Sequence, residues 1–151
     1  MTAPTLSKIH LRGSIFLECA VVNDAIAPLL KPAAANYTIH HSVSTSFNAD
    51  EKLINVDLTT TCVGLDEQAA TLPVNGRFRL YFTFEVDNLE ELLEMRDGET
   101  QAIPNEQLSL TLISVAYSTA RGMILSKTVD TVLHGFALPL LDVRSFVKTG
   151  D

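Results

Sequence analysis

Alternating apolar and polar positions dominate the first half of the chain. From Ile9 to Val21 every odd position except Gly13 is apolar. A period of two over this length predicts a half-buried strand, in which Gly13 marks a bulge or a bend. Asn48–Glu51 is typical of a hairpin turn, and similar alternating runs predict three further strands, at Tyr37–Phe47, Ile54–Cys62 and Phe78–Val86. We therefore expect a four-stranded antiparallel sheet with one polar face.

The second half of the chain has the spacing of helices. Asn88–Arg96 predicts a short helix or turn that Asn88 caps, with Glu91 as its capping-box partner. Pro104 and Asn105 precede a long helix that includes Leu108–Leu125. Its apolar positions form two neighbouring stripes: Leu108, Leu112, Val115 and Thr119, and Ile113, Ala116, Ala120 and Ile124. Together these stripes are wider than the packing against one sheet requires.

The C-terminal segment predicts one more short element. Val143, Phe146 and Val147 suit a short helix with Asp142 as its cap. The expected fold class is therefore α+β: a four-stranded antiparallel sheet, then a long helix, then a short C-terminal helix. We expect residues 1–151 to form a single domain, because 151 residues is the usual size of one domain.

The composition describes an apolar but acidic chain. Hydrophobic residues make up 46% of it and charged residues 19%, which excludes intrinsic disorder. The formal net charge of −7 argues against nucleic acid or an anionic membrane as a partner bound through bulk charge. Serines, threonines and Arg121 within Leu108–Leu125 argue against membrane insertion. The N-terminus lacks the pattern of a signal peptide, so we expect a cytoplasmic location.

Residues with catalytic or metal-binding chemistry are few. Cys19 and Cys62 have no metal-binding spacing, and in strand-like runs they behave as small hydrophobic residues. His40 and His41 are adjacent on a predicted strand, so their side chains point to opposite faces. Ser118, Thr119 and Arg121 predict local backbone hydrogen bonds and an arginine paired with an acid. We predict no metal, no cofactor and no enzymatic activity.

Several apolar side chains lie where a simple sheet would meet water. Phe78, Phe82 and Phe84 share one strand face and predict the core between sheet and helix. Phe16 and Tyr81 lie at the alternate positions, which face away from this core, and are either isolated exposed aromatics or part of a binding surface. Ile26, Leu29 and Leu30 lie in a proline-containing connector, where they either fold over the core or form the wall of an apolar groove.

Acidic residues gather after the fourth predicted strand. Glu85, Asp87, Glu90, Glu91, Glu94, Asp97 and Glu99 lie there, with Arg96 as the single base among them. Such a cluster is either a solvated face or an acidic docking surface for a basic partner.

The order of the predicted elements and the amino-acid sequence of the long helix resemble those of the SecB-like chaperones. The similarity is strongest in Ser114–Gly122 (SVAYSTARG) and continues in Leu138–Asp142 (LPLLD), and Lys31-Pro32 is a weaker match. The resemblance implies a homotetramer, a dimer of dimers, with the long helices packed between sheets. It also implies a holdase that binds unfolded client proteins in apolar grooves without ATP. In one branch of the family the client passes to SecA for protein export, and in another the chaperone protects an antitoxin.

The resemblance and the apolar pattern lead to three sets of site residues. The expected client-binding residues are Phe16, Ile26, Leu29, Leu30, Phe136 and Phe146. The implied oligomer interface is Leu108, Leu112, Val115, Thr119 and Met123. The expected acidic docking surface is Glu85, Asp87, Glu90, Glu91 and Glu94.

Three functions follow from these patterns. The leading hypothesis is an ATP-independent holdase, possible partners being SecA or an antitoxin. Because no long acidic tail follows Phe146, the divergent SecB-like group fits better than the export-type members. The second hypothesis is an antitoxin-type module with a single partner. The third is a small-molecule enzyme or carrier with a cavity between sheet and helix.

Overall fold

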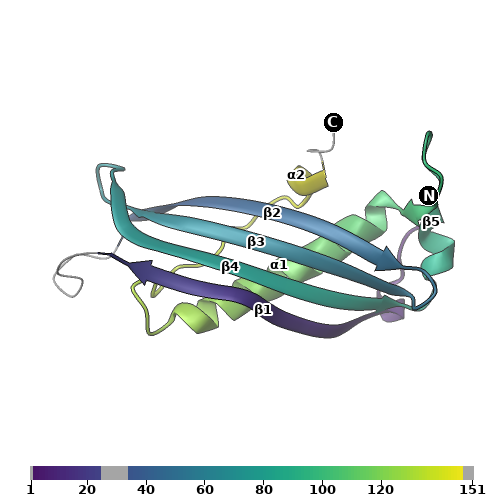
Figure 1. Ribbon diagram of the computed structural model, residues 1–151, viewed down its shortest axis with the longest axis horizontal. Helices are drawn as coiled ribbons and strands as arrows, with labels where there is room; N and C mark the ends of the chain where they lie inside the picture. Colours follow the sequence, from purple (N-terminus) through teal and green to yellow (C-terminus); the bar gives the residue numbers. More distant parts are fainter. Residues whose placement is uncertain (1, 25–33, 148–151) are drawn as a thin grey trace.

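The computed structural model describes residues 2–24 and 34–147, and within them a long sheet lies against one long helix (Figure 1). The four main strands are β1 (Ile9–Asn23), β2 (Asn36–Asn48), β3 (Leu53–Leu65) and β4 (Thr71–Val86). They form an antiparallel sheet in the order β1-β4-β3-β2, so β1 and β2 are its two edges. This confirms the predicted sheet, with every strand longer than its predicted core.

The remaining elements are shorter, apart from the long helix. A 3-10 turn, η1 (Leu6–Lys8), precedes β1, and η3 (Leu89–Leu92) follows β4. A two-residue hairpin, β5 (Leu93–Glu94) with β6 (Ile103–Pro104), leads to the long helix α1 (Glu106–Thr128). The last described element is α2 (Arg144–Val147). The fold class, α+β with a long helix and a short C-terminal helix after the sheet, is the predicted one.

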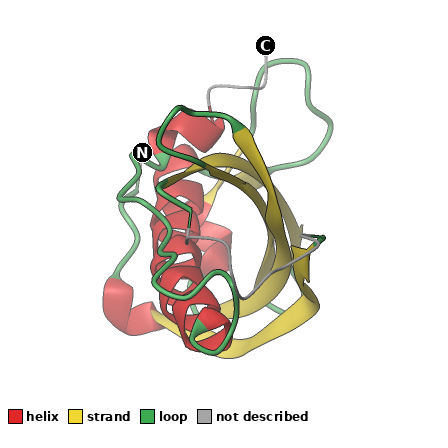
Figure 2. Cartoon of the chain, turned by 90° about the vertical axis from the view of Figure 1, so that its left-hand side faces the viewer, coloured by secondary structure: helices red, strands yellow, loops and turns green. Residues whose placement is uncertain are grey.

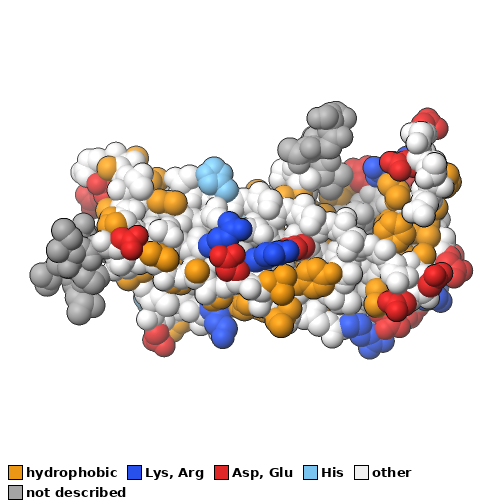
Figure 3. All heavy atoms as spheres, in the orientation of Figure 1, with side chains coloured by type: hydrophobic (Ala, Val, Ile, Leu, Met, Phe, Trp, Pro, Cys, Tyr) orange, Lys and Arg blue, Asp and Glu red, His pale blue; other side chains and the backbone are white. Residues whose placement is uncertain are grey.

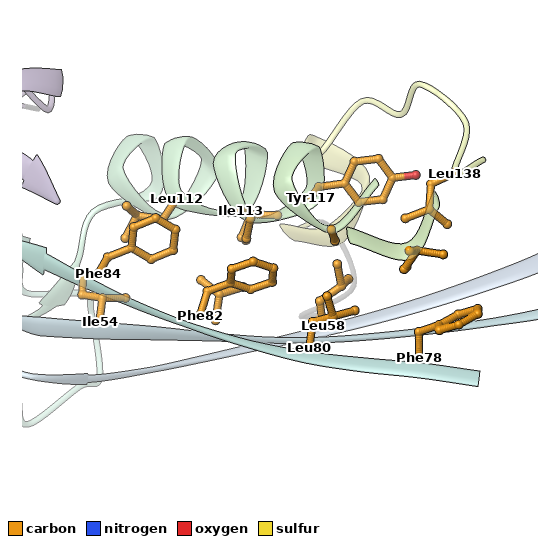
Figure 4. Close-up of a cluster of buried hydrophobic side chains, with 14 of the residues drawn as sticks. Ile54, Leu58, Phe78, Leu80, Phe82, Phe84, Leu112, Ile113, Tyr117 and Leu138 are labelled. Carbon is orange, nitrogen blue, oxygen red and sulfur yellow. The ribbon is translucent and has the colours of Figure 1, made fainter. Parts of the chain in front are cut away.

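The core lies between the inner face of the sheet and α1 (Figure 2). On β4, Phe78, Phe82 and Phe84 are completely buried, as predicted. Their partners on β3 are also apolar, since Phe82 pairs with Val56 and Phe84 with Ile54. Figure 4 shows these side chains pointing toward those of α1. The removal of this apolar surface from water is the main force that holds sheet and helix together.

The helix begins where the sequence predicts. Asn105 is its N-cap, and its side-chain oxygen accepts a hydrogen bond from the backbone N–H of Leu108 at 2.8 Å. By length and composition alone, α1 is apolar enough to cross a membrane. Its inner stripe nevertheless packs on the sheet, where Leu112, Ala116 and Ala120 are buried.

The short helix or turn predicted within Asn88–Arg96 is a helical turn that is shorter than this range, and the predicted cap is wrong. The helical turn stops at Leu92, because Leu93 becomes extended and pairs with Pro104. Leu89 and Leu92, three residues apart, are fully buried, which suits a 3-10 turn. The Asn88 side chain donates to the Glu91 carboxylate at 2.8 Å and forms no hydrogen bond with the backbone.

The inner face predicted for β1 is also wrong over part of its length. Register shifts between Leu11 and Gly13 and between Phe16 and Glu18 each insert an extra residue opposite β4. Each insertion reverses the alternation. Phe16 therefore pairs with Leu80 on the inner face, while Ile15 pairs with Tyr81 on the outer face and is 58% exposed. The bulge predicted at Gly13 is confirmed, and the second one had no signal in the sequence.

Candidate functional site

A hollow lies between β2 and α1, next to the β5–β6 hairpin. It encloses about 330 Å³ and is open to solvent along one side. Its lining is mostly apolar, with Arg96 and Glu106 as charged members. The apolar lining residues are Val43, Phe47, Ile54, Ile103, Pro104, Ile113 and Phe146, and the hydroxyl-bearing ones are Thr45, Ser46 and Ser109. We call this hollow the β2 groove.

The β2 groove follows from the curvature of the sheet and the position of its edge. Val43, Thr45 and Phe47 alternate along the inner side of β2, the strand farthest from β1. Val43 and Phe47 pack against the core, while Thr45 is exposed at the rim. Ile113 of α1 forms the floor and is only 4% exposed. An apolar floor beneath an open rim suits the apolar side chains of an extended peptide.

An aromatic cluster closes one end of the groove. Phe146 of α2 lies edge-on to His41 of β2 at 5.9 Å between ring centroids, and Tyr117 of α1 lies edge-on to His41 at 5.4 Å. The His41 Nδ1 atom is 2.9 Å from the Thr60 hydroxyl oxygen. Burial lowers the pKa of His41, and the neighbouring His40 adds a smaller effect in the same direction. His41 is therefore a neutral ring at neutral pH that packs as an aromatic.

Two side chains of α1 hold the segment that leads to α2. The Tyr117 hydroxyl donates to the Pro139 carbonyl at 2.8 Å, and the Arg121 Nε–H donates to the Leu138 carbonyl at 2.8 Å. The two residues are four positions apart, so they lie on the same side of the helix. Arg121 was expected to pair with an acid, but it donates to a backbone carbonyl and forms no ion pair with the acids that the structure describes. The two bonds fix the chain just before α2, and so help to place Phe146.

The predicted client-binding residues are dispersed in the structure. Among the three that the structure describes, only Phe146 lines the β2 groove. Phe136 is 2% exposed and packs edge-on against Tyr37 at 4.9 Å, so its assignment to a client surface is wrong. Phe16 packs against the core from β1, on the face opposite to the one predicted. The predicted residues Ile26, Leu29 and Leu30 lie outside the described residues.

The predicted oligomer interface divides into two groups. Leu108 and Leu112 are completely buried against the sheet of their own subunit, so they cannot contact another copy. Both residues lie on the side of α1 that covers β3 and β4. Val115 is 38% exposed, and Thr119 and Met123 are half-buried, so these three stay a prediction.

The acidic residues at the end of β4 are largely engaged with neighbours. Glu85 pairs with Arg12, and the Asp87 carboxylate lies 3.1 Å from the His10 Nε2 atom. Glu91 accepts a hydrogen bond from Asn88. Glu90 is exposed and Glu94 half-buried. An acidic docking surface over these five residues stays a prediction, with its charge partly compensated by the bases.

The outer face of the sheet carries further ion pairs. The Arg79 Nη2 atom is 2.6 Å from the Asp57 carboxylate, and the Arg77 Nε atom is 2.8 Å from that of Glu18. Figure 3 shows apolar side chains beside such charged groups near the middle of this face. Exposed pairs like these contribute little to stability, but they leave the face close to neutral.

The described residues hold no cluster of three or more side chains suited to a metal ion. Of the two cysteines, Cys62 is buried and its thiol pKa is raised by burial. Cys19 is exposed on β1, contrary to its prediction as a packed hydrophobic residue.

The fold has a counterpart among solved structures. The structure is similar to the SecB-like chaperone Rv1957 of Mycobacterium tuberculosis, solved in complex with a ChAD peptide from the HigA1 antitoxin (Rv1956). The TM-score is 0.58 at 14% sequence identity, and the match covers 89% of this chain and 91% of that one. The chain has a SecB-like fold. The resemblance found in the sequence is confirmed at the level of the fold.

Other comparisons add less. A Streptococcus agalactiae protein of unknown function matches with a TM-score of 0.43 and 6% identity, covering 87% of this chain and 97% of that one. No protein-family model matches the sequence. No curated protein matches it either.

The residues of the β2 groove were mostly missed by sequence reasoning. Val43, Phe47 and Ile54 were assigned to strands as ordinary core positions, and Arg96 to a solvated acidic run. The alternation shows which side chains share a strand face. It does not show which strand lies at the edge of the sheet, and the groove depends on that.

Proposed function

We propose that this protein is a chaperone that binds unfolded or partly folded polypeptides in the β2 groove. The observation that carries this proposal is an open, mainly apolar groove of about 330 Å³ at the edge of a SecB-like fold. The groove is lined by residues of β2, β3, the β5–β6 hairpin, α1 and α2, which together present side chains to an extended segment. The similar Mycobacterium structure was solved with a bound peptide, which supports peptide binding as the function of the fold.

The proposed activity is holding, without ATP and without a chemical reaction. The groove combines apolar walls with hydroxyl groups, and its charged members, Arg96 and Glu106, are of opposite sign. Such a surface binds apolar and aromatic side chains through burial rather than through covalent chemistry. The sequence also contains no glycine-rich phosphate loop. We propose a cytoplasmic location for this activity.

A second candidate function is protection of one dedicated partner. It is favoured by the antitoxin peptide in the similar structure. A pull-down that recovers one partner in equimolar amount would support it, whereas recovery of many unrelated clients would support general holding. Export through SecA is a weaker proposal, because the acids of the outer sheet face are paired with Arg77, Arg79 and Arg12.

We also propose that the subunits assemble through the outward face of α1, as a homotetramer. Between Glu106 and Lys127 the helix has a single charged residue, Arg121, which bonds to Leu138. Val115 and Leu125 are exposed on it. A side chain built at Gly122 would meet no atom within 4 Å in the subunit, so packing within the subunit does not require a glycine there. A second helix approaching closely would require one.

Suppression of aggregation tests the chaperone function. Reduced insulin B chain aggregates on its own, and an equimolar amount of the protein should suppress its light scattering. Thr45→Glu places a charge at the exposed rim of the β2 groove and should abolish most of this suppression. Ile15→Glu, an equally exposed change on β1, is the matched control and should retain it. Absence of suppression by the unaltered protein, together with absence of binding to unfolded peptides, would contradict the proposal.

A further inference from the structure

The charge of Arg121 has no counter-charge within the described part of the chain. Arg121 is the single charged residue of α1 between Glu106 and Lys127, and it is half-buried. Its Nε–H donates to the Leu138 carbonyl at 2.8 Å. The ion pairs of the described residues all involve other bases. A partly buried cation loses hydration that no ion pair offsets here, so an anion from outside the subunit would be stabilised next to it.

Arg121 borders a second hollow, which lies between α1 and the segment that leads to α2. This hollow holds about 300 Å³, which is enough for a small ligand or the end of a chain. It is lined by Ser114, Tyr117, Ser118 and Arg121 of α1 and by residues 140–143. It shares no lining residue with the β2 groove, so the two can be occupied separately. We call this hollow the Arg121 pocket.

The hydrogen bond to Leu138 prepares Arg121 to bind a carboxylate. A guanidinium group has five N–H donors in one plane, and the bond from Nε fixes the direction of that plane. The two terminal nitrogens remain, and together they match the two oxygens of a carboxylate. A lysine at this position would present a single charged nitrogen instead of a fork.

Two serine hydroxyls supply further donors. Ser114 and Ser118 are four positions apart and lie on the side of α1 that borders the Arg121 pocket. On the same helix, the hydroxyls of Thr111 and Thr119 each donate to the carbonyl four residues earlier, at 2.8 Å. Neither serine side chain forms a hydrogen bond with any residue that the structure describes. Both hydroxyls are therefore able to donate to a bound anion.

Asp142 is the one acidic residue that lines the Arg121 pocket, and its charge is compensated. Its carboxylate accepts hydrogen bonds from the Arg144 Nη2 atom at 2.6 Å and the Arg144 Nε atom at 2.9 Å. The backbone N–H of Arg144 also donates to it, at 3.1 Å. Arg121 therefore remains as the uncompensated charge of the pocket, and this charge attracts an anion.

The wall opposite α1 is mainly apolar. It contains Leu140, Leu141 and Val143, and Leu140 is 86% exposed. Residues 136–142 belong to no helix or strand, so their backbone groups are not used in a helix or a sheet. A fitting ligand has a carboxylate for Arg121 and an apolar group beside it. The C-terminal residue of a polypeptide carries both on one carbon atom, whereas an internal Asp or Glu carries the carboxylate alone.

We propose that the Arg121 pocket binds the C-terminus of a partner polypeptide whose last residue is apolar. The Arg121 fork and the serine hydroxyls hold the carboxylate, and the last side chain packs against Leu140, Leu141 and Val143. This site is separate from the β2 groove and goes beyond the holding of unfolded segments. It favours a dedicated partner over clients in general, because each chain has a single C-terminus.

A pair of short peptides tests the recognition of the chain end. The probe is fluorescein-labelled Gly-Ser-Gly-Ser-Val-Leu with a free carboxylate, and its counterpart ends in a carboxamide. We expect the acid to bind roughly tenfold or more tightly than the amide in fluorescence anisotropy. Ser118→Glu places a carboxylate at the exposed edge of the Arg121 pocket and should weaken binding of the acid roughly tenfold. Ser126→Glu makes the same change on α1 outside the pocket and should alter this affinity less than about twofold.

The contrary outcomes are specific. Equal affinity for acid and amide would show that the carboxylate is not recognised. If the amide Gly-Ser-Gly-Glu-Val-Leu binds as tightly as the acid, a side-chain carboxylate suffices and the proposal is overturned. If N-acetyl-leucine competes with the affinity of the whole peptide, the pocket binds a small free acid and the proposal is overturned as well. A changed sedimentation coefficient of Ser118→Glu without loss of peptide affinity would assign the pocket to the assembly instead.

The test is independent of the proposed chaperone function. Failure of the acid peptide to bind would overturn this site, while suppression of insulin B chain aggregation, and its loss in Thr45→Glu, would still support the β2 groove. Ser118 lies outside that groove, so the Ser118→Glu protein should suppress aggregation like the unaltered protein. This result would also show that the variant is folded.

Discussion

The two edges of the sheet have similar sequence patterns and different surroundings. β1 and β2 both alternate apolar and polar residues, and both pair with a single neighbour among the described strands. On β1 the pattern is interrupted by two bulges, which turn Ile15 and Leu17 outward among ion pairs. On β2 the pattern is regular, and beneath it lies a groove lined by α1 and α2. This difference indicates that an edge strand without bulges or charged residues is a candidate binding site when an apolar groove lies beside it.

The largest difference in peptide affinity should appear when a carboxylate is placed on one edge strand or on the other. Thr45→Glu on β2 should weaken binding of a short, end-blocked apolar peptide with a lysine at each end roughly tenfold or more. The reason is that the bound peptide would cover the new carboxylate and remove it from water. We refer to this probe as the lysine-flanked peptide. Ile15→Glu on β1 should change the affinity less than about twofold. Fluorescence anisotropy measures both. Similar losses in the two variants would remove the distinction between the edges.

The next largest effect on peptide affinity should come from Phe146, which lies at the closed end of the β2 groove. Phe146→Ala removes a ring that packs on His41 and lines the groove, and should weaken peptide binding about threefold to tenfold. Leu140→Ala is the matched control, because that side chain is 86% exposed and lies outside the groove lining. Isothermal titration of both variants measures the change. Tighter binding by Phe146→Ala would show that the ring obstructs the groove instead of contributing to it.

A smaller effect tests whether the outward face of α1 is a third interaction surface. Gly122→Ala should stabilise the isolated subunit by about 0.5–1 kcal/mol, since glycine costs that much inside a helix and the added methyl group meets no atom within 4 Å. The same methyl group should weaken an assembly that needs close helix contact. Chemical unfolding and sedimentation velocity measure the two effects. A Gly122→Ala protein with an unchanged tetramer would contradict the proposed interface.

The smallest expected effect is a dependence of the folding stability on pH, which comes from His41 on β2. The pKa of His41 is lower in the folded than in the unfolded chain, so the unfolded chain takes up the proton first as the pH falls. His41 therefore has its full stabilising effect above its ordinary pKa of 6.5, and stability falls as the pH drops below that value. The loss should be less than about 1 kcal/mol, because solvent screens a half-buried ring.

Substitution of His41 isolates this dependence. His41→Phe should flatten the loss of stability between pH 7 and pH 5 relative to the unaltered protein. Urea unfolding at a series of pH values measures the difference. A pH dependence of equal slope in the His41→Phe protein would show that other groups cause it.

Much of the fold could be predicted from periodicity, and the errors have physical causes. The four strands, the Asn105 cap and the long helix follow from local patterns and were expected. The face of Phe16 was missed because the bulge near Gly13 reverses the alternation ahead of Phe16 and the second bulge restores it afterwards, so the apolar odd positions on both sides give no sign of the reversal. Leu108 and Leu112 were assigned to an interface because a stripe on a helix shows that it is buried, but not by what.

The candidate site was less accessible to sequence reasoning than the fold. Phe146 was expected as a client-binding residue and does line the groove, but Phe136 lies in the core. The groove depends on the strand order, which places β2 at the edge, and on the hydrogen bonds from Tyr117 and Arg121 that hold the segment before α2. Both are long-range features. The motif that suggested the SecB-like family includes these two residues, although their structural role was not evident from it.

Hydrogen exchange along both edge strands tests the central claim most directly. Amides of β2 between Val43 and Phe47 should become protected when the lysine-flanked peptide is added, and amides of β1 between Ile15 and Cys19 should exchange at an unchanged rate. This result would place the client on the β2 groove. Protection confined to β1, or no change at either edge under conditions in which the peptide is bound, would contradict the account.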